Sequence, residues 1–371
     1  MARLRMGMIG GGPGSFIGPV HRIAAELDHE CELVAGAFSS DAARSESAGA
    51  SYGIDPARAY PSVEAMLGDE RARADGIEFV AIVTPNHLHL PHARAVLETG
   101  LPVLSDKPAT ATLAQARELA RVVEEHSLPY ALTYTYSGYP LVREARARIE
   151  AGALGNVRKV IVEYSQGWLA GNLSSKQADW RLDPARSGPG GCIADIGVHA
   201  FHLAEFITGL RVAQLLADLD AVVPGRRVDD DCSILLRFEN GARGVLIASQ
   251  ISVGELNGLS IRDFGENGSI ACSQEQPNSL TLHHGDGRME MLRAGDASLG
   301  PYARGATRLP GGHPEGYIEA FANLYRDFAA VVRGEERALL PGIQDGLRSM
   351  TFVETAIAAC RGGKAWVDLE I

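Results

Sequence analysis

The sequence predicts an α/β protein of two domains: an N-terminal doubly wound parallel sheet, and a C-terminal α+β domain with a large, mostly antiparallel, open sheet. Up to about residue 137, short apolar strand patterns alternate with helix patterns, which is typical of a parallel sheet covered on both faces. From residue 157 onward, strand patterns follow one another directly. The 371 residues also exceed the usual size of one domain. A Ser-Gly-Tyr-Pro break sets the predicted domains at 1–137 and 138–371.

In the first domain, the predicted strands and helices alternate regularly. An apolar run at 4–9 predicts the first strand, and Ile23, Ala24 and Leu27 indicate the helix after it. The run 79–83 is apolar throughout, as expected of a strand buried on both faces. The remaining strand patterns lie at 31–38, from 103 onward and at 130–136, the last predicted as a sixth strand, and the remaining helix patterns lie at 41–52, 90–98 and 113–126.

A glycine cluster follows the first strand. Gly10 and Gly12 match the first two glycines of the G-x-G-x-x-G fingerprint, which is typical of a Rossmann domain and lets backbone amides approach a pyrophosphate. The third position is Ser15, so Gly18 fits only if the loop is three residues longer. We expect Gly10, Gly12 and Gly14 to bind a dinucleotide, whereas flexible turn glycines without a ligand are the alternative.

The residues after the second strand should distinguish the two nicotinamide dinucleotides. NAD enzymes place an acid there, and NADP enzymes place a basic residue nearby. Ser39 stands at the position expected of the acid, and Ser40 and Arg44 could bind the additional phosphate of NADP, whereas Asp41 would repel it. The candidate cofactors are therefore NAD and NADP, and on balance we expect NAD.

A lysine stands where an apolar strand meets a proline, in Leu104-Ser105-Asp106-Lys107-Pro108. Ligands of an open parallel sheet bind outside the carboxyl ends of the strands, so we predict that Lys107 faces the ligand and that Asp106 lies beside the cofactor. On position alone, a solvated loop lysine is an equally good interpretation.

The central strand is followed by Thr84-Pro85-Asn86-His87, which we interpret as a helix start that contributes Thr84, Asn86 and His87 to the cofactor site. Histidines at 87, 89 and 92 also suggest a metal site. Residues 87 and 89 point apart, however, and no carboxylate accompanies them. We therefore expect no metal.

Composition narrows the classes of partner. The net charge of -11 argues against nonspecific binding to nucleic acid or anionic membranes. The 5 cysteines are scattered without a C-x-x-C pair, which suggests neither a zinc site nor a disulfide framework. No apolar run approaches the ~20 residues of a membrane span, and no signal-peptide pattern follows Met1. We expect a cytoplasmic protein that binds neither nucleic acid nor membrane.

The second domain consists mainly of strands with alternating polarity. An antiparallel sheet can leave one face open, and an exposed apolar face usually marks a subunit interface, so we expect a homodimer or homotetramer formed through it. The turn Glu239-Asn240-Gly241 joins two of the strands. The strand patterns lie at 159–164, 213–223, 232–239, 244–252, 259–265 and 269–272, between helix patterns at 141–151 and 318–332.

The strongest functional signal lies ahead of that sheet, where a glycine-rich entry leads into a helix pattern containing Asp195 and His199. At spacing i and i+4 the two side chains share one helix face. A histidine can exchange a proton near neutral pH, and a nearby carboxylate can orient it or hold the substrate. A buried, structural Asp-His pair is the alternative.

These motifs together resemble the Gfo/Idh/MocA family of oxidoreductases, which includes inositol dehydrogenases and glucose-fructose oxidoreductase. The resemblance runs nearly end to end, through the glycine turn that precedes His21, the T-P-N-H segment, Asp106-Lys107-Pro108 and the D-x-G-x-H segment. It implies that Lys107, Asp195 and His199 are the catalytic residues, and Trp180-Arg181 matches the family's W-R segment. Departures are Asp106 for glutamate, Ser137 for arginine, His202 for aspartate and a longer glycine loop.

The resemblance implies an NAD(P)-dependent dehydrogenase that oxidises a secondary hydroxyl of an inositol, polyol or sugar. Two alternatives remain: a sugar-sensing regulator that binds NAD(P) without catalysis, and a redox-assisted glycosidase. The expected substrate contacts are Lys107, Tyr136, Trp168, Trp180, Arg181, Asp195, His199 and His202.

Overall fold

The chain folds into two units. The computed structural model describes residues 2–171, 175–363 and 365–370. The first unit comprises Met1–Tyr134 and Phe321–Leu347, and the second comprises Thr135–Ala320 and Arg348–Ile371. The chain therefore leaves the first unit, forms most of the second, and then returns to complete the first. The domain boundary between 137 and 138 stays a prediction.

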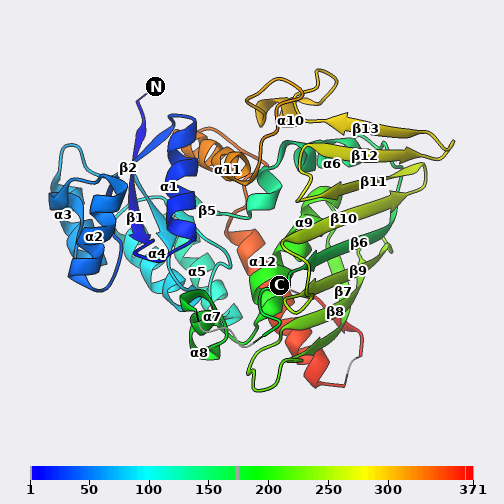
Figure 1. Cartoon of the computed structure of the whole chain (residues 1–371), viewed down its shortest axis with the longest axis horizontal. Helices are drawn as coiled ribbons and strands as arrows, with labels where there is room; N and C mark the ends of the chain where they lie inside the picture. The colour runs from blue at the N-terminus through cyan, green and yellow to red at the C-terminus, as the bar shows by residue number, and fades with distance from the viewer. Residues whose placement is uncertain (1, 172–174, 364, 371) are drawn as a thin grey trace. The chain divides into compact units, whose positions relative to one another are not determined.

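The first unit contains a parallel sheet with strand order β2-β1-β3-β4-β5 (Figure 1). Every residue of β3 is buried, as its continuous apolar run predicts. The alternation of strands and helices is thereby confirmed as a Rossmann-like α/β fold. The strands are β1 (Leu4–Gly10), β2 (Cys31–Ala37), β3 (Phe79–Val83), β4 (Val103–Ser105) and β5 (Tyr130–Leu132).

The prediction of a sixth strand at 130–136 is wrong, because β5 is the fifth strand of this sheet and ends at Leu132. The amide of Tyr134 donates back to the Leu132 carbonyl at 3.0 Å, which turns the chain out of the sheet. The following residues form the 3₁₀ helix η3 (Thr135–Gly138). Between α2 (Ala42–Tyr52) and β3 the chain forms η1 (Pro56–Arg58) and α3 (Val63–Ala72) without an intervening strand.

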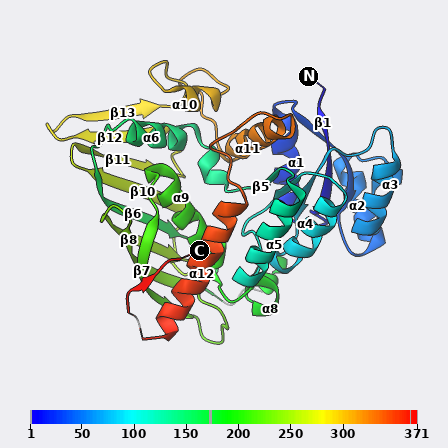
Figure 2. The same cartoon turned by 180° about the vertical axis from the view of Figure 1, so that it is seen from behind.

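Helices cover both faces of this sheet. Helix α1 lies in front of the strands in Figure 1, and α4 and α5 lie in front of them in Figure 2. Asp41, Ser62 and Thr112 cap the amino ends of α2, α3 and α5 by accepting a backbone N–H. The helices are α1 (Ile17–Leu27), α2 (Ala42–Tyr52), α3 (Val63–Ala72), η2 (Asn86–Leu88), α4 (His89–Glu98), α5 (Leu113–His126) and most of α11 (Tyr317–Val332).

The second unit contains a large sheet with strand order β13-β12-β11-β10-β6-β9-β8-β7-β14 (Figure 1). Only β6 and β9 pair in parallel among its described strands, so the mostly antiparallel sheet is confirmed. The strands are β6 (Val157–Ser165), β7 (Val212–Asp220), β8 (Asp231–Phe238), β9 (Arg243–Ser249), β10 (Gly258–Gly265), β11 (Gly268–Ser273), β12 (Ser279–His284), β13 (Met289–Arg293) and β14 (Val367–Asp368).

One face of this sheet is covered by α6 (Pro140–Glu150), α9 (Val198–Thr208) and the later part of α12 (Ile343–Arg361), as Figures 1 and 2 show. The other face carries no covering helix among the described residues, and strand residues alternate between buried and exposed. An apolar row crosses this open face through paired positions of β7, β8, β9 and β6, namely Leu216, Leu235, Val245 and Ile161.

Two strands and one helical detail differ from the sequence-based expectation. Strand β13 was not predicted, because four of its five residues are exposed and carry no inward apolar repeat. Strand β12 was not predicted either, although it alternates through the buried Leu280 and Leu282. Residues Ile193–Gly197 form a π-helical turn, η4, that continues directly into α9. The other short helices are α7 (Lys176–Arg181), α8 (Pro184–Ser187) and α10 (Pro301–Gly305). No helix within the described residues is both long and apolar enough to span a membrane.

Candidate active site

The glycine turn after β1 requires glycine at several positions. Gly10 has a φ of 92°, in the left-handed region that favours glycine. A Cβ on Gly12 would lie 2.6 Å from the Phe38 carbonyl oxygen, and one on Gly18 would lie 2.6 Å from the Gly11 Cα. Gly18, at the start of α1, thus provides the close helix-to-turn packing of the third fingerprint glycine. The strictly spaced Ser15 instead accepts the Gly18 amide through Oγ at 3.2 Å.

The residues after β2 are tied into local hydrogen bonds. Ser39 Oγ accepts the Asp41 amide at 3.2 Å, and the Asp41 carboxylate accepts the Arg44 amide at 2.8 Å as the cap of α2. The Arg44 guanidinium donates to the Pro13 carbonyl in the glycine turn at 3.5 Å. Ser40 is exposed. The structure therefore brings Ser39, Arg44 and the glycine turn together.

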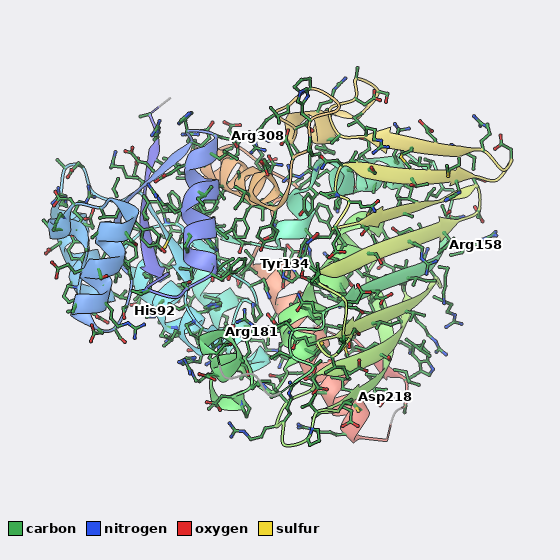
Figure 3. The ribbon with its side chains drawn as sticks, in the orientation of Figure 1. His92, Tyr134, Arg158, Arg181, Asp218 and Arg308 are labelled. Carbon is green, nitrogen blue, oxygen red and sulfur yellow. The ribbon has the colours of Figure 1, made fainter. Side chains whose placement is uncertain are left out.

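The loop after β3 is joined to the end of β4 by His89. Its ring nitrogens lie 2.8 Å from the Thr84 carbonyl oxygen and 2.7 Å from the Pro108 carbonyl oxygen, and burial lowers the pKa of its imidazole. Asn86 is buried at the start of η2. Burial also lowers the pKa of His92 to about 4 (labelled in Figure 3). Among the described residues, no three His, Cys, Asp or Glu side chains cluster in a way that could hold a metal ion.

Lys107 is half-buried at the end of β4, where its peptide bond to Pro108 is cis. Asp106 holds this segment through Oδ1, which accepts the Lys107 amide at 2.9 Å and the Thr133 hydroxyl at 2.9 Å. Strands β1, β3 and β4 are neighbours in the sheet. Gly10, Thr84 and Lys107 therefore emerge side by side at the carboxyl edge, where parallel sheets bind ligands.

This edge fits a dinucleotide. A Cβ on Gly10, Gly11 or Gly12 would lie less than 3.0 Å from a neighbouring atom. These positions therefore hold bare backbone, whose amides a pyrophosphate can approach closely. The serines and the guanidinium after β2 supply polar groups suited to a ribose or its phosphate. The described residues of the first unit thus match the chemistry of NAD or NADP.

In the second unit, Asp195 lies in η4 and its carboxylate is held from two sides. Its Oδ2 accepts Arg181 Nε at 3.1 Å and Gln250 Nε2 at 2.9 Å. The Arg181 guanidinium also stacks over the Trp180 ring, 4.3 Å from its centroid (Arg181 is labelled in Figure 3). Gln250 was not predicted as a site residue, because it follows β9 and only the fold brings it to Asp195.

Asp229 anchors the amino end of the helical segment that carries Asp195 and His199. Its two carboxylate oxygens each accept a backbone amide at 2.7 Å, from Gly191 and from Ile193. Its carbonyl accepts the Cys192 amide at 2.8 Å. Burial raises the pKa of Asp229 to about 6, although the two amides favour the charged form. No sequence motif marked this residue.

His199 lies on α9 among aromatic rings. Its imidazole contacts the Tyr136 ring edge to face, with centroids 4.7 Å apart, and lies 6.1 Å from the Tyr164 ring. His202 is buried one turn further along, and its ring stacks on Phe206 at 5.6 Å. The structure thus brings His199 and Tyr136 together, whereas His202 contacts an apolar ring of its own helix.

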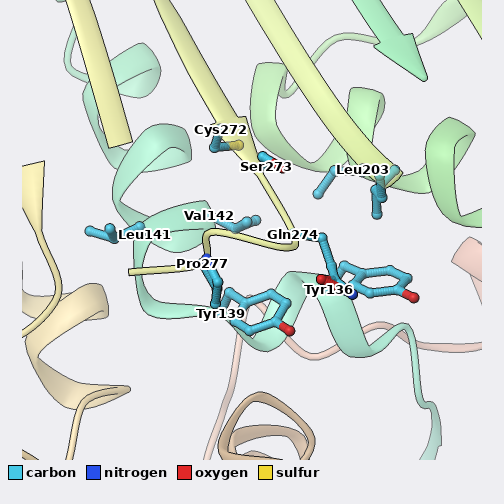
Figure 4. A pocket seen from close by; sticks show the side chains of 10 residues that line it. Tyr136, Tyr139, Leu141, Val142, Leu203, Cys272, Ser273, Gln274 and Pro277 are labelled. Atoms are coloured by element: carbon cyan, nitrogen blue, oxygen red, sulfur yellow. The ribbon is translucent and has the colours of Figure 1, made fainter. Parts of the chain in front are cut away.

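The remaining predicted substrate contact, Trp168, donates its indole N–H to Gln166 Oε1 at 2.9 Å. Next to Tyr136, a largely apolar pocket opens between α6 and the residues after β11, and Figure 4 shows the Tyr136 and Tyr139 rings along one of its walls. Leu141, Leu203 and Pro277 also line it.

Comparisons with known proteins agree with the fold of the two units. Residues 4–134 match the oxidoreductase family with an NAD-binding Rossmann fold, and residues 142–271 match the GFO/IDH/MocA C-terminal domain. An inositol dehydrogenase homolog from Azotobacter vinelandii, solved with NADH and myo-inositol, superposes with a TM-score of 0.92 at 34% identity, covering 99% of this chain and 97% of that chain.

Two curated relatives extend over the whole chain. The Bacillus subtilis (strain 168) oxidoreductase YfiI is 33% identical over 381 residues, covering 99% of this chain and 97% of its own. Levoglucosan dehydrogenase from Pseudarthrobacter phenanthrenivorans is 26% identical over 397 residues, covering 100% of this chain and 99% of its own. This chain belongs to the GFO/IDH/MocA family of oxidoreductases.

Proposed function

We propose that this protein is an NAD(P)-dependent dehydrogenase that oxidises a secondary hydroxyl of an inositol, polyol or sugar. The observation that carries the proposal is the segment Asp195–His199. It places a carboxylate fixed by two hydrogen bonds four residues before a histidine that packs against an aromatic ring. The Azotobacter vinelandii homolog was solved with NADH and myo-inositol, and another relative is named for levoglucosan, which supports this class of substrate.

In this proposal His199 is the general base that takes the hydroxyl proton. Lys107 stabilises the alkoxide that develops, because a fixed cation aimed at new negative charge lowers the barrier. Asp195 orients the substrate hydroxyls or the imidazole. Bound nicotinamide supplies the hydride acceptor.

The proposed contacts extend to both ligands. We assign the cofactor to the glycine turn, the residues after β2 and the ends of β3 and β4, and the substrate to the aromatic and charged groups of the second unit. The cofactor residues are Gly10, Gly12, Gly14, Ser39, Ser40, Arg44, Thr84, Asn86, His87, Asp106 and Lys107. The substrate residues are Lys107, Tyr136, Trp168, Trp180, Arg181, Asp195, His199 and His202.

A panel of inositols and aldoses, each offered with NAD and with NADP, tests the activity through the absorbance of the reduced cofactor. We expect turnover with NAD in preference to NADP, because Asp41 opposes the additional phosphate. Binding of cofactor and sugar without any turnover would favour a regulator. Glycosidic cleavage without net cofactor reduction would favour a glycosidase.

The assignment of the base is tested by His199→Ala, which we expect to lower kcat by ~100-fold or more. The matched control is His283→Ala, on the exposed side of β12, which should leave kcat unchanged. Wild-type turnover in the His199→Ala protein would remove His199 from the mechanism. We further propose a cytoplasmic homodimer or homotetramer formed through the open face of the second sheet.

A further inference from the structure

Three polar groups beside His199 form a closed ring of hydrogen bonds. The hydroxyls of Tyr136 and Tyr164 bond to each other. The Tyr164 hydroxyl donates to Asn257 Oδ1 at 2.6 Å, and Asn257 Nδ2 donates to the Tyr136 hydroxyl at 3.3 Å. The ring joins η3, β6 and the loop before β10, which are distant in sequence.

The direction of each bond in this ring follows from counting protons. A phenol has one proton to donate, and an amide oxygen can only accept. Tyr164 gives its proton to Asn257 Oδ1, so the bond between the tyrosines must be donated by Tyr136. Both phenolic protons are therefore committed within the protein, and Tyr136 can meet a substrate hydroxyl only as an acceptor.

The two tyrosines of the ring are buried and Asn257 is half-buried, and the hydrogen bonds continue to the indole of Trp168. Gln166 Nε2 donates to Asn257 Oδ1 at 2.8 Å, while Gln166 Oε1 accepts the Trp168 indole N–H at 2.9 Å. Burial is the main cause that raises the pKa of both tyrosines above the usual value. The two phenols therefore stay protonated across the working range of pH and do not act as acids.

The geometry points to Asn257 as a positioning residue for His199. Asn257 holds the Tyr136 hydroxyl through a hydrogen bond. The Tyr136 ring in turn packs against the His199 imidazole, with ring centroids 4.7 Å apart and an interplanar angle of 73°. An edge-to-face contact of this kind restricts the rotation of both rings. An imidazole held at one angle directs its nitrogen at one substrate hydroxyl. This inference rests on the proposed role of His199 as the base.

Other ionisable groups surround α9 and bear on any titration of His199. Asp195 acts electrostatically on Tyr164 and is itself bonded to Arg181. On α6, Arg143 donates to the Ser137 carbonyl and Glu144 pairs with Arg148. Titratable or charged groups on the elements packed against α9 include Tyr136 on η3, Tyr164 on β6, Asp195 on η4, Arg143, Glu144 and Arg146 on α6 and Asp263 on β10, with His202 and Glu205 on α9 itself. Tyr317, at the start of α11, lies against the Tyr136 ring.

The test is Asn257→Asp, which keeps the shape and the acceptor for Tyr164, removes the donor to Tyr136 and adds a negative charge near the imidazole. We expect the acid limb of the kcat/KM profile to move up by about half to one pH unit, because the charge favours protonated His199. Asn257→Leu should lower kcat by ~5-fold or more and leave KM little changed. The control is Gln276→Glu, at an exposed amide after β11, which should change neither the acid limb of the kcat/KM profile nor kcat.

A measurement without turnover separates this inference from the proposed function. In protein labelled with ¹³C histidine, the His199 ring signals report its titration directly, and their pKa should be higher in Asn257→Asp than in wild type. Absence of dehydrogenase activity in wild type would count against the proposed function only. An identical His199 titration and pH profile in folded Asn257→Asp protein would overturn the role of Asn257. If that variant does not fold, unchanged kcat in Asn257→Leu overturns it equally.

Discussion

The end of β4 carries the side chain on which the proposed chemistry depends most. Replacement of Lys107 by methionine keeps the length of the side chain and removes its charge, so we expect turnover to fall by ~100-fold or more. Cofactor affinity, measured by NADH fluorescence, should fall far less than turnover, because the glycine turn and the residues after β2 supply most of the proposed cofactor contacts. Lys159→Met, on the open face of the second sheet, is the control. Normal turnover in Lys107→Met would show that the alkoxide is stabilised by another group.

A single carboxyl on β10 should make stability depend on pH. Asp263 is fully buried, neither oxygen has a hydrogen-bond partner among the described residues, and burial raises its pKa from 3.8 to about 8. The folded state therefore holds this proton more tightly than the unfolded state, and stability contributed by the group is lost as pH rises from about 4 to 8.

The corresponding variant is Asp263→Asn, which cannot ionise. Its urea midpoint, relative to wild type, should rise steadily from pH 5 through about pH 8 and level off above that, once Asp263 is ionised in both the folded and the unfolded state. The difference should amount to a few kcal/mol in the free energy of unfolding. Asp218→Asn, an exposed change on β7 (labelled in Figure 3), is the comparison and should show no such trend. A constant difference between Asp263→Asn and wild type at all pH values would contradict the shifted pKa.

Residues of the candidate site could be proposed from the sequence where their signal is local. Lys107 follows from the strand that ends before it, and the spacing of Asp195 and His199 follows from one helical segment. Gln250 and Asp229 could not be found in this way, because each reaches that segment from a different part of the chain. The ring through Asn257 was missed for the same reason.

At the level of elements, the start of α1 shows how closely the first helix must approach the glycine turn. A Cβ on Gly18 would lie 2.6 Å from the Gly11 Cα and 2.7 Å from the Tyr52 hydroxyl. Gly18→Ala should therefore displace the turn and weaken NADH binding by ~10-fold or more in a fluorescence titration.

A glycine with open space provides the matched control. Gly68 lies within α3, and a Cβ there would meet nothing within 4 Å. Gly68→Ala should raise the free energy of unfolding by about 0.5–1 kcal/mol, since alanine favours a helix over glycine, and should leave NADH binding unchanged. Equal NADH affinity in both variants would mean that Gly18 serves the helix alone.

Element boundaries followed the local pattern except where tertiary contacts decide them. The alternation of apolar residues located β6 to β11 within a few residues, and the Gly241 turn between β8 and β9 has the left-handed φ of 86° expected there. The π-helical turn η4 has no such signal, because it depends on amides held by Asp229. Strand β13 is mostly exposed and so carried no apolar repeat.

At the level of the whole molecule, the open face of the second sheet is the proposed subunit interface. Leu235 lies in the middle of its apolar row and is 45% exposed. Leu235→Glu would place a charge in the proposed interface, and light scattering should then report a monomer where wild type forms a dimer or tetramer. Gln276→Glu, an exposed change in the turn after β11, should keep the wild-type mass. A monomeric wild type would disprove this interface outright.

The return of the chain to its first unit has a consequence for synthesis on the ribosome. Phe79 in β3 packs on Tyr325 and Phe328, His21 bonds to the Tyr325 hydroxyl, and the amide of Leu132 in β5 donates to the carbonyl of Pro341. These partners emerge only after nearly all of the second unit has been made. Until then, part of the apolar core of the nascent Rossmann sheet stays exposed. A chaperone that shields apolar surface would therefore bind this protein before its last helix has been synthesised.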